Sequence, residues 1–258
     1  MTTKHLNFLL LSLLLSFFAN AQQTSFKYKK YDWEQEPQHG NYSFNDSTDY
    51  VLLLSKYLFN YRVLHGDYTE EKLVHISAYI NNQAGIEEFN KVYLAETEDT
   101  HLAAFKARVI TGNKVQEITE KQIQKGIFDE TGTEFTYFAL EGLEKGSIVE
   151  FFYIVQQRPR FTGVRLDFQA SVPIQRFELD IYSPYYLEYI AKVYNYEAEL
   201  ELKENRKENI QSLYLNNIPA FEHEKNAPNV ANYGRVIFKI HKNTSNKDKE
   251  NKALVTYE

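Results

Sequence analysis

About a dozen short apolar segments, often separated by turn residues, follow one another from Asp49 onward, and this pattern constrains the fold more than any other feature. In several segments apolar and polar residues alternate, which is the period of a half-buried strand. Residues that favour pleated surfaces are abundant, with 20 Tyr and 18 Phe. The sequence shows no long amphipathic helix. It therefore predicts an all-β, antiparallel sandwich-like domain with minor helix.

The individual strands are predicted from alternation and from the turn residues between them. The predicted ranges are 50–62, 72–80, 86–94, 102–111, 114–118, 134–140, 147–157, 163–170, 173–182, 186–196, 198–203, 210–216 and 235–242. In one of these ranges Ala103, Phe105, Ala107 and Val109 are expected on one face. In another, Phe177, Leu179 and Ile181 are expected inward and Arg176, Glu178 and Asp180 outward. Gly112 and Asn113 predict a hairpin turn, and residues 119–123 a short helix.

The first 21 residues have the parts of a secretory signal peptide. Lys4 and the amino terminus provide positive charge, residues 8–18 form an apolar run, and Ala19-Asn20-Ala21 is a small-x-small cleavage pattern. The apolar run is shorter than the roughly 20 residues that span a bilayer. A buried core helix is the alternative interpretation. We expect cleavage after Ala21 and an exported protein, periplasmic or extracellular, that has no transmembrane segment after cleavage.

The remaining chain is expected to form three parts. Residues 22–48 are polar with dispersed aromatic residues, which predicts an N-terminal extension that packs through those rings. Residues 49–242 contain the predicted strands. Residues 243–252 are fully polar and charged, and an apolar stretch begins just after them. We therefore expect residues 243–258 to be a linker toward a missing downstream domain.

Composition argues against several classes of function. The chain has 29 Lys and Arg against 35 Asp and Glu, a net charge of −6, whereas nucleic-acid-binding proteins carry clustered positive charge. Cysteine is absent, which excludes disulfides, thiolate zinc sites and cysteine nucleophiles from this chain. The sequence has no His-Glu-x-x-His, no Gly-x-Ser-x-Gly and no phosphate-binding glycine loop. We expect no cofactor, no metal and no catalytic residue.

Acidic residues provide weaker alternatives. Asn45, Asp46 and Asp49 are close in sequence, but they lack the full set of calcium ligands, so a turn explains them better. Pairs of glutamates near each other in sequence leave an enzyme with a carboxylate site as the least favoured hypothesis. Arg108 and Glu150 lie in apolar strands and are expected either to pair across sheets or to face solvent.

A cluster of tyrosines is the candidate interaction surface. Its members are Tyr182, Tyr185, Tyr186, Tyr189, Tyr194 and Tyr196. If these rings are exposed, they can stack on sugars or contact a protein partner. The alternative is that several of them are core or sheet-face rings.

Three segments resemble the domain-of-unknown-function 3857 family, which comprises β-rich domains found N-terminal to transglutaminase-like domains in exported bacterial proteins. The segments are residues 105–115 (FKARVITGNKV), 143–151 (LEKGSIVEF) and 172–179 (VPIQRFEL). The resemblance spans roughly residues 26–242. The family usually has Pro-Asp-Gly where this chain has Thr111-Gly112-Asn113, a turn that still provides positive φ.

The resemblance implies that a transglutaminase-like domain with a Cys-His-Asp triad follows in the complete protein. That triad cannot lie here, because the chain has no cysteine. We therefore expect an exported non-catalytic module that packs on the downstream domain or presents substrate to it. The alternative is a stand-alone module that binds an envelope peptide or glycan through the tyrosine cluster.

Overall fold

The structure is a computed structural model of the chain. It describes residues 31–33, 47–64, 67–94, 100–128, 130, 132, 134–160, 162–222 and 229–245. The chain divides into two units, residues 1–40 and 41–258. Of the first unit only residues 31–33 are described, with the Trp33 amide donating to the Asp32 side chain. The predicted signal peptide lies outside the described residues. So do Asn45 and Asp46 of the acidic cluster, and most of the predicted extension and linker.

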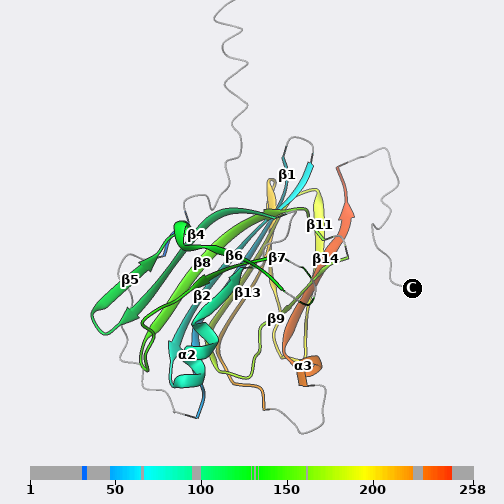
Figure 1. The fold of residues 1–258 in the computed structure, drawn as a ribbon. Helices are drawn as coiled ribbons and strands as arrows, with labels where there is room; N and C mark the ends of the chain where they lie inside the picture. Colours follow the sequence, from blue (N-terminus) through cyan, green and yellow to red (C-terminus); the bar gives the residue numbers. More distant parts are fainter. Residues whose placement is uncertain are drawn as a thin grey trace, which may run out of the picture. The chain divides into compact units, whose positions relative to one another are not determined.

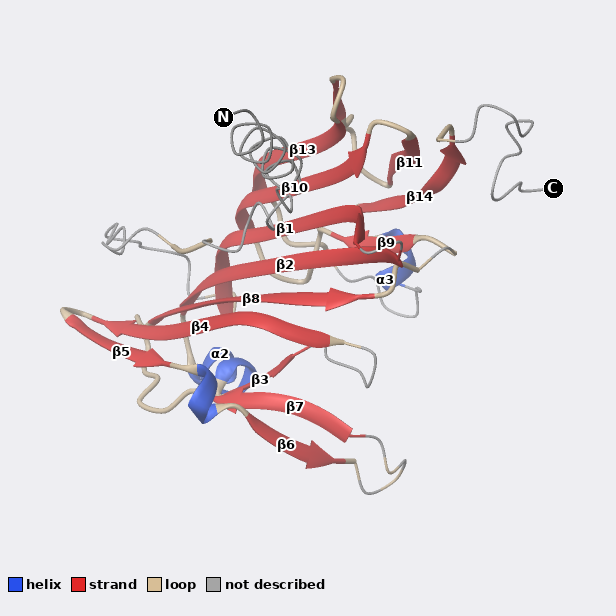
Figure 2. Cartoon of the chain, turned by 90° about the horizontal axis from the view of Figure 1, so that it is seen from above, coloured by secondary structure: helices blue, strands red, loops and turns tan. Residues whose placement is uncertain are grey.

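An eight-stranded sheet, here called sheet A, is the largest element of the second unit (Figures 1 and 2). Its strands, in spatial order, are β12 (Glu201–Glu204), β13 (Glu208–Ile218), β10 (Ile174–Pro184), β1 (Tyr50–Leu64), β2 (Asp67–Ile80), β8 (Ile148–Gln157), β4 (His101–Thr111) and β5 (Lys114–Ile118). All neighbours are antiparallel except β1 and β10, which are parallel. The prediction of antiparallel pairing is therefore wrong at this one place. No hairpin joins these two strands, so no tight turn imposes an antiparallel direction.

Two three-stranded antiparallel sheets complete the β structure that is described. Sheet B has the order β3 (Lys91–Leu94), β7 (Glu134–Ala139) and β6 (Gln124–Ile127). Sheet C has the order β11 (Leu187–Tyr194), β14 (Arg235–Asn243) and β9 (Val164–Asp167). The short helices are α2 (Gln83–Phe89), the 3-10 helix η2 (Glu120–Gln122) and α3 (Asn229–Asn232). The prediction of an all-β fold with minor helix is confirmed.

Both small sheets pack on the same face of sheet A. A row of directly opposed residues crosses six strands of that face: Leu213, Leu179, Tyr57, Val74, Tyr153 and Phe105. Opposed residues on neighbouring strands share a face. One end of this row belongs to the core under sheet B, the other end to the core under sheet C, and Tyr57 packs against both cores. The outer faces of sheets B and C therefore both point away from sheet A.

Most predicted strands are present, but the range 86–94 is wrong in its first half. Asn82 begins helix α2 instead, because its side-chain oxygen accepts from the backbone N–H of Ala84 at 2.9 Å and of Gly85 at 3.2 Å. Asn is among the preferred residues at a helix N-cap, as well as a turn residue. The predicted short helix at 119–123 is the 3-10 helix η2, with the Thr119 amide donating to Gln122 Oε1 at 2.9 Å.

Two side-chain predictions also need correction. A β-bulge between Leu102 and Ala104 shifts the alternation of β4, so Leu102 packs into the core while Ala103 is exposed. Asp180 lies on the face of sheet A away from the two cores, as predicted, but it is buried. There its carboxylate accepts hydrogen bonds from Ser212 Oγ and Tyr214 Oη, both at 2.6 Å.

We expect Gly85→Ala to destabilise the fold by about 1–3 kcal/mol, the usual range for overpacking. Alanine is the better helix former, but a Cβ at this position would lie 2.3 Å from the backbone carbonyl oxygen of Asp49. Urea unfolding measures the effect, and the exposed neighbour Gln83→Ala is the control, expected within about 0.5 kcal/mol of the parent. A Gly85→Ala protein as stable as the parent would contradict the close approach.

Candidate functional site

The six tyrosines of the predicted interaction surface do not share one environment. Tyr189 on β11 packs against the core under sheet C and stacks on Tyr61 with a centroid distance of 4.4 Å. Tyr196 packs against the same core and contacts the Phe168 ring edge-on at 5.2 Å. These two rings therefore have the core role that was the alternative interpretation.

The other four tyrosines lie nearer the surface. Tyr182 on β10 is half-buried, and Tyr194 at the end of β11 is exposed. Tyr185 and Tyr186 form the turn between these strands, with their rings edge to face at 5.4 Å. The cluster is thus divided between core and surface, because successive residues of a strand point to opposite faces.

A different aromatic cluster covers the outer face of sheet B. It consists of Tyr93, Phe128, Phe135 and Tyr137, and with Lys91 we call it the aromatic face. Tyr93 and Phe128 are 51% and 47% exposed, which is unusual for such large rings. The ring centroids of Phe128 and Phe135 are 4.3 Å apart, and those of Tyr93 and Phe135 are 5.4 Å apart.

The register of sheet B explains why these rings meet. Tyr93 on β3 is opposite Tyr137 on β7, while the alternate residue Phe138 points into the core. Phe135 is opposite Gly126 on β6. A Cβ at Gly126 would lie only 2.4 Å from the Phe135 ring, so the glycine leaves the space that the ring occupies. The strand pairing thus assembles on one face aromatic residues that are dispersed over the sequence.

Lys91 lies among these rings and adds a positive charge. Its Nζ is 3.8 Å from the Tyr137 ring centroid, 5.2 Å from that of Phe135 and 5.4 Å from that of Tyr93. These distances are within the range of cation–π attraction. The Tyr137 hydroxyl donates to Gln124 Oε1 at 2.6 Å. Aromatic side chains are enriched in protein interfaces, so the exposed rings of this cluster are typical of an interaction site.

Sequence reasoning missed this site for a specific reason. Residues 91–93 and 135–137 each show only an ordinary strand alternation. Their convergence depends on which strands pair, and that is a tertiary property. The tyrosines at 182–196 were singled out because they are close in sequence, which does not place side chains on the same face.

Charged residues on the opposite face of sheet A form a buried ionic group. Arg108 Nε donates to Glu150 Oε2 at 2.6 Å, and His75 Nε2 lies 3.0 Å from Glu150 Oε1. Arg108 and Glu150 therefore pair, but between adjacent strands of one sheet rather than across sheets. Burial tends to raise the pKa of Glu150, but the hydrogen bond and charge of His75, together with Arg108, outweigh it and hold the pKa below its usual value.

A second buried carboxylate, that of Glu70, lies near the start of β2. Gln157 Nε2 donates to Glu70 Oε1 at 2.6 Å. Burial raises the pKa of Glu70, and the hydrogen bonds from Tyr61 and Gln157 and the charges of Lys72 and Arg160 offset only part of that effect. The neighbouring Glu71, on the opposite face, is an ion-pair partner of Arg62.

We expect Glu70→Gln to stabilise the protein increasingly as pH rises. A carboxyl whose folded-state pKa is raised contributes fully to stability below the unfolded pKa of about 4.3, and this contribution is lost as pH rises through the folded pKa. Glutamine stays neutral and avoids that loss. Urea unfolding of both proteins from acid to alkaline pH measures the difference. A stabilisation confined to acid pH would contradict the assignment.

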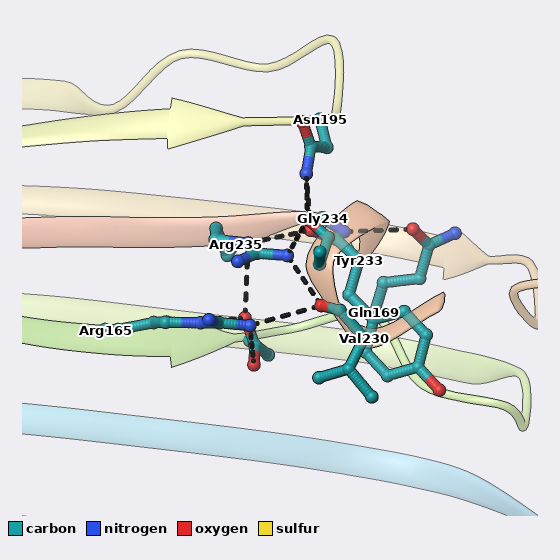
Figure 3. A network of polar contacts seen from close by, with 9 residues as sticks. Arg165, Gln169, Asn195, Val230, Tyr233, Gly234 and Arg235 are labelled. Atoms are coloured by element: carbon teal, nitrogen blue, oxygen red, sulfur yellow. Dashed lines mark hydrogen bonds and ion pairs between the residues drawn. The ribbon is translucent and has the colours of Figure 1, made fainter. Parts of the chain in front are cut away.

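A third polar network has a structural role (Figure 3). The buried Arg235 side chain donates to the backbone carbonyls of Val230 at 2.7 Å and Tyr233 at 3.1 Å. Asn195, which has a left-handed backbone with φ of 58°, donates to the carbonyl of Ala231 at 2.9 Å. These bonds satisfy carbonyl groups at the C-terminal end of α3 that have no partner within the helix. The network therefore fixes α3 against sheet C.

Within the described ranges, no group of three or more His, Asp or Glu side chains is placed to hold a metal ion. Among the helices that the structure describes, none is long and apolar enough to cross a membrane.

The fold is that of an all-β module in which one large sheet carries two small sheets on the same face. The chain belongs to the domain of unknown function 3857 family (DUF3857, a family with a solved structure), whose match covers residues 66–222, more than half of the chain. The family resemblance inferred from three short segments is thus confirmed. No curated protein matches the chain.

One solved structure shows this fold within a longer protein. A putative protease from Parabacteroides distasonis superimposes with a TM-score of 0.63 at 11% sequence identity, covering 74% of this chain and 40% of that chain. An M1 zinc metallopeptidase from Deinococcus radiodurans gives a TM-score of 0.40 at 10% identity, covering 74% of this chain and 42% of that chain. The chain thus spans less than half the length of these solved proteins.

Proposed function

We propose that this chain is a non-catalytic module of an exported protein, which packs on a downstream catalytic domain of the same polypeptide and positions substrate for it. We propose further that the aromatic face of sheet B is the contact surface and that the downstream domain is transglutaminase-like. The observation that carries the proposal is the half-exposed cluster of Tyr93 and Phe128 around Lys91. Large exposed aromatic patches are typical of interaction sites.

The comparison with the Parabacteroides distasonis structure supports the expectation of a further domain. There the matching part is 40% of the chain, so a fold of this kind is part of a longer polypeptide. Several aromatic rings held together on one rigid sheet lose little side-chain freedom on binding, which favours their use as anchors.

A stand-alone module that binds envelope glycan or peptide is the second candidate. It is favoured by the exposed rings of Tyr93, Tyr185 and Tyr194, because tyrosines can stack on sugars and also donate hydrogen bonds. Binding of the 258-residue chain on a glycan or peptide array, abolished by Tyr185→Ala with Tyr186→Ala or by Tyr93→Ala, would support this candidate. Absence of such binding would leave the first proposal.

The decisive experiment recovers the native gene product from cells with an antibody raised against this chain. Its mass is measured first, and a mass well above 30.4 kDa, the mass of the chain, is expected. Hydrogen exchange then compares the native product with the 258-residue chain. We expect residues 91–94, 124–128 and 134–139 to be more protected in the longer protein.

Matched variants make the test specific to the aromatic face. Tyr93→Ala in the native polypeptide should remove the additional protection, whereas Tyr185→Ala, which truncates an equally exposed tyrosine elsewhere, should retain it. A native product no larger than this chain, or a longer one in which sheet B exchanges as in the isolated chain, would overturn the proposal.

A further inference from the structure

The outer face of sheet C is strongly basic. By the pairing register, alternate residues of β11, β14 and β9 point away from the core. The charged residues on this outer face, here called the basic face, are Arg165, Lys192, Arg235, Lys239 and Lys242, with Asp167 and Glu188. Among them Arg235 is buried against α3, and the others are at least partly exposed. Without the buried Arg235, four positive charges against two negative ones leave 4 − 2 = +2, in a protein whose net charge is −6. The charge of this face therefore opposes that of the whole molecule.

The arginines of the basic face are held in place before any partner binds. Arg165 Nη2 lies 3.0 Å from Asp167 Oδ2, and Arg235 Nε lies 3.4 Å from Asp167 Oδ1. Arg165 also donates to the carbonyl of Val230 at 3.1 Å, as Arg235 does (Figure 3). Asp167 is shared between both guanidinium groups and neutralises only one of them. Fixed charges of this kind attract opposite charge without a large loss of side-chain freedom.

Apolar side chains are interleaved with these charges. Ile190 and Tyr194 on β11 are exposed, and Ile237 on β14 is opposite both Lys192 and Arg165. Lys192 Nζ is 5.3 Å from the Tyr194 ring centroid. A surface that alternates apolar and basic residues on a flat sheet fits a folded protein surface with acidic and apolar groups. Nucleic acid is disfavoured because proteins that bind it carry larger clusters of positive charge than this face does.

The basic face and the aromatic face lie on the same side of sheet A. Sheets B and C pack on one face of sheet A, and Tyr57 packs against both cores, so their outer faces both point away from the large sheet (Figure 2). A single partner can therefore cover both faces. We infer that the basic face binds an acidic surface on the same downstream domain that covers the aromatic face. This inference rests on the proposed function and adds the chemistry of the partner: an apolar site facing sheet B and a carboxylate-rich site facing sheet C.

Carbodiimide cross-linking of the native polypeptide tests the inference, because the reagent joins a lysine to a carboxylate only when they are in contact. We expect Lys192 or Lys239 to be cross-linked to Asp or Glu residues beyond residue 258. The yield should fall at high salt, since the screening length decreases from about 10 Å at 0.1 M to about 3 Å at 1 M. Lys192→Gln with Lys239→Gln should abolish these cross-links. The exposed Lys203 on β12, at the edge of sheet A, is the internal control: it contacts Glu201 at 3.1 Å and should be cross-linked within the chain but not to residues beyond 258.

The outcomes separate the two proposals. Protection of the aromatic face without cross-links from the basic face would overturn this inference and leave the proposed function intact. Absence of both in a longer native product would overturn both. Salt-sensitive binding of duplex DNA by the 258-residue chain, lost in Lys192→Gln with Lys239→Gln, would also overturn the inference, because it would assign the basic face to nucleic acid.

Discussion

Phe138→Ala is expected to lower the free energy of unfolding by about 3–5 kcal/mol, the range for removing a buried aromatic ring. Phe138 on β7 is completely buried and is one of the sheet B residues that pack into the core against sheet A. Its centroid is 4.8 Å from that of Phe105 and 5.6 Å from that of Phe151, both with edge-on geometry. Truncation leaves a cavity that two sheets cannot close without moving relative to each other.

Urea unfolding measures this loss, and hydrogen exchange locates it. Exchange should accelerate most in sheet B, which the ring attaches to the main sheet. Tyr93→Ala is the matched control, because it truncates a ring on the outer face of the same small sheet and should cost about 1 kcal/mol or less. Equal losses for both substitutions would contradict the core position of Phe138.

Arg108→Met is expected to destabilise the protein by about 3–5 kcal/mol, the range for breaking a buried ion pair from one side. Methionine can fill much of the space of the arginine stem, but the Glu150 carboxylate would keep only the His75 bond. The guanidinium is nearly inaccessible to solvent, so little water can replace it. Urea unfolding at neutral pH provides the measurement.

The double variant Arg108→Met with Glu150→Leu distinguishes two contributions to the destabilisation. One is the loss of the Arg108–Glu150 interaction, and the other is the cost of leaving the Glu150 carboxylate buried without its arginine. Replacing both partners by apolar groups removes the unpaired carboxylate, so this variant should be more stable than Arg108→Met alone. In the parent, the lowered pKa of Glu150 implies stability that is present above the unfolded pKa of about 4.3 and is lost as pH falls through the folded pKa. An Arg108→Met protein that loses as much stability in acid as the parent does would argue against the coupling between Arg108 and Glu150.

The sequence identified the residues of the Arg108–Glu150 pair but not those of the aromatic and basic faces. Arg108 and Glu150 were recognised in the sequence because charges in apolar strands need partners, but either a cross-sheet pair or solvent exposure fitted the pattern. The structure places them on adjacent strands, where the pairing of β4 with β8 brings the two side chains together. The aromatic and basic faces were not recognised at all, since each combines three strands that are separate in sequence.

Two local predictions failed because the same sequence pattern is compatible with two structures. Asn82 precedes a helix rather than a turn because its side chain caps two backbone amides, and Asn is common in both settings. Ala103 is exposed because a bulge adds one residue to β4, and a bulge leaves no mark in a simple alternation of apolar residues.

The sequence by itself determined that this protein is built from strands and where most of them lie. It also determined which side chains of a strand enter the core, as with Phe177, Leu179 and Ile181 of β10, because the period of two is a local property of an extended chain. It also determined the family, through short segments that carry turn and strand positions together. Only the tertiary structure decided that β1 runs parallel to β10, that two small sheets share one face of the large one, and which side chains remain exposed on their outer faces. Pairing between strands far apart in the chain depends on the free energy of the whole packed assembly, which no local pattern contains.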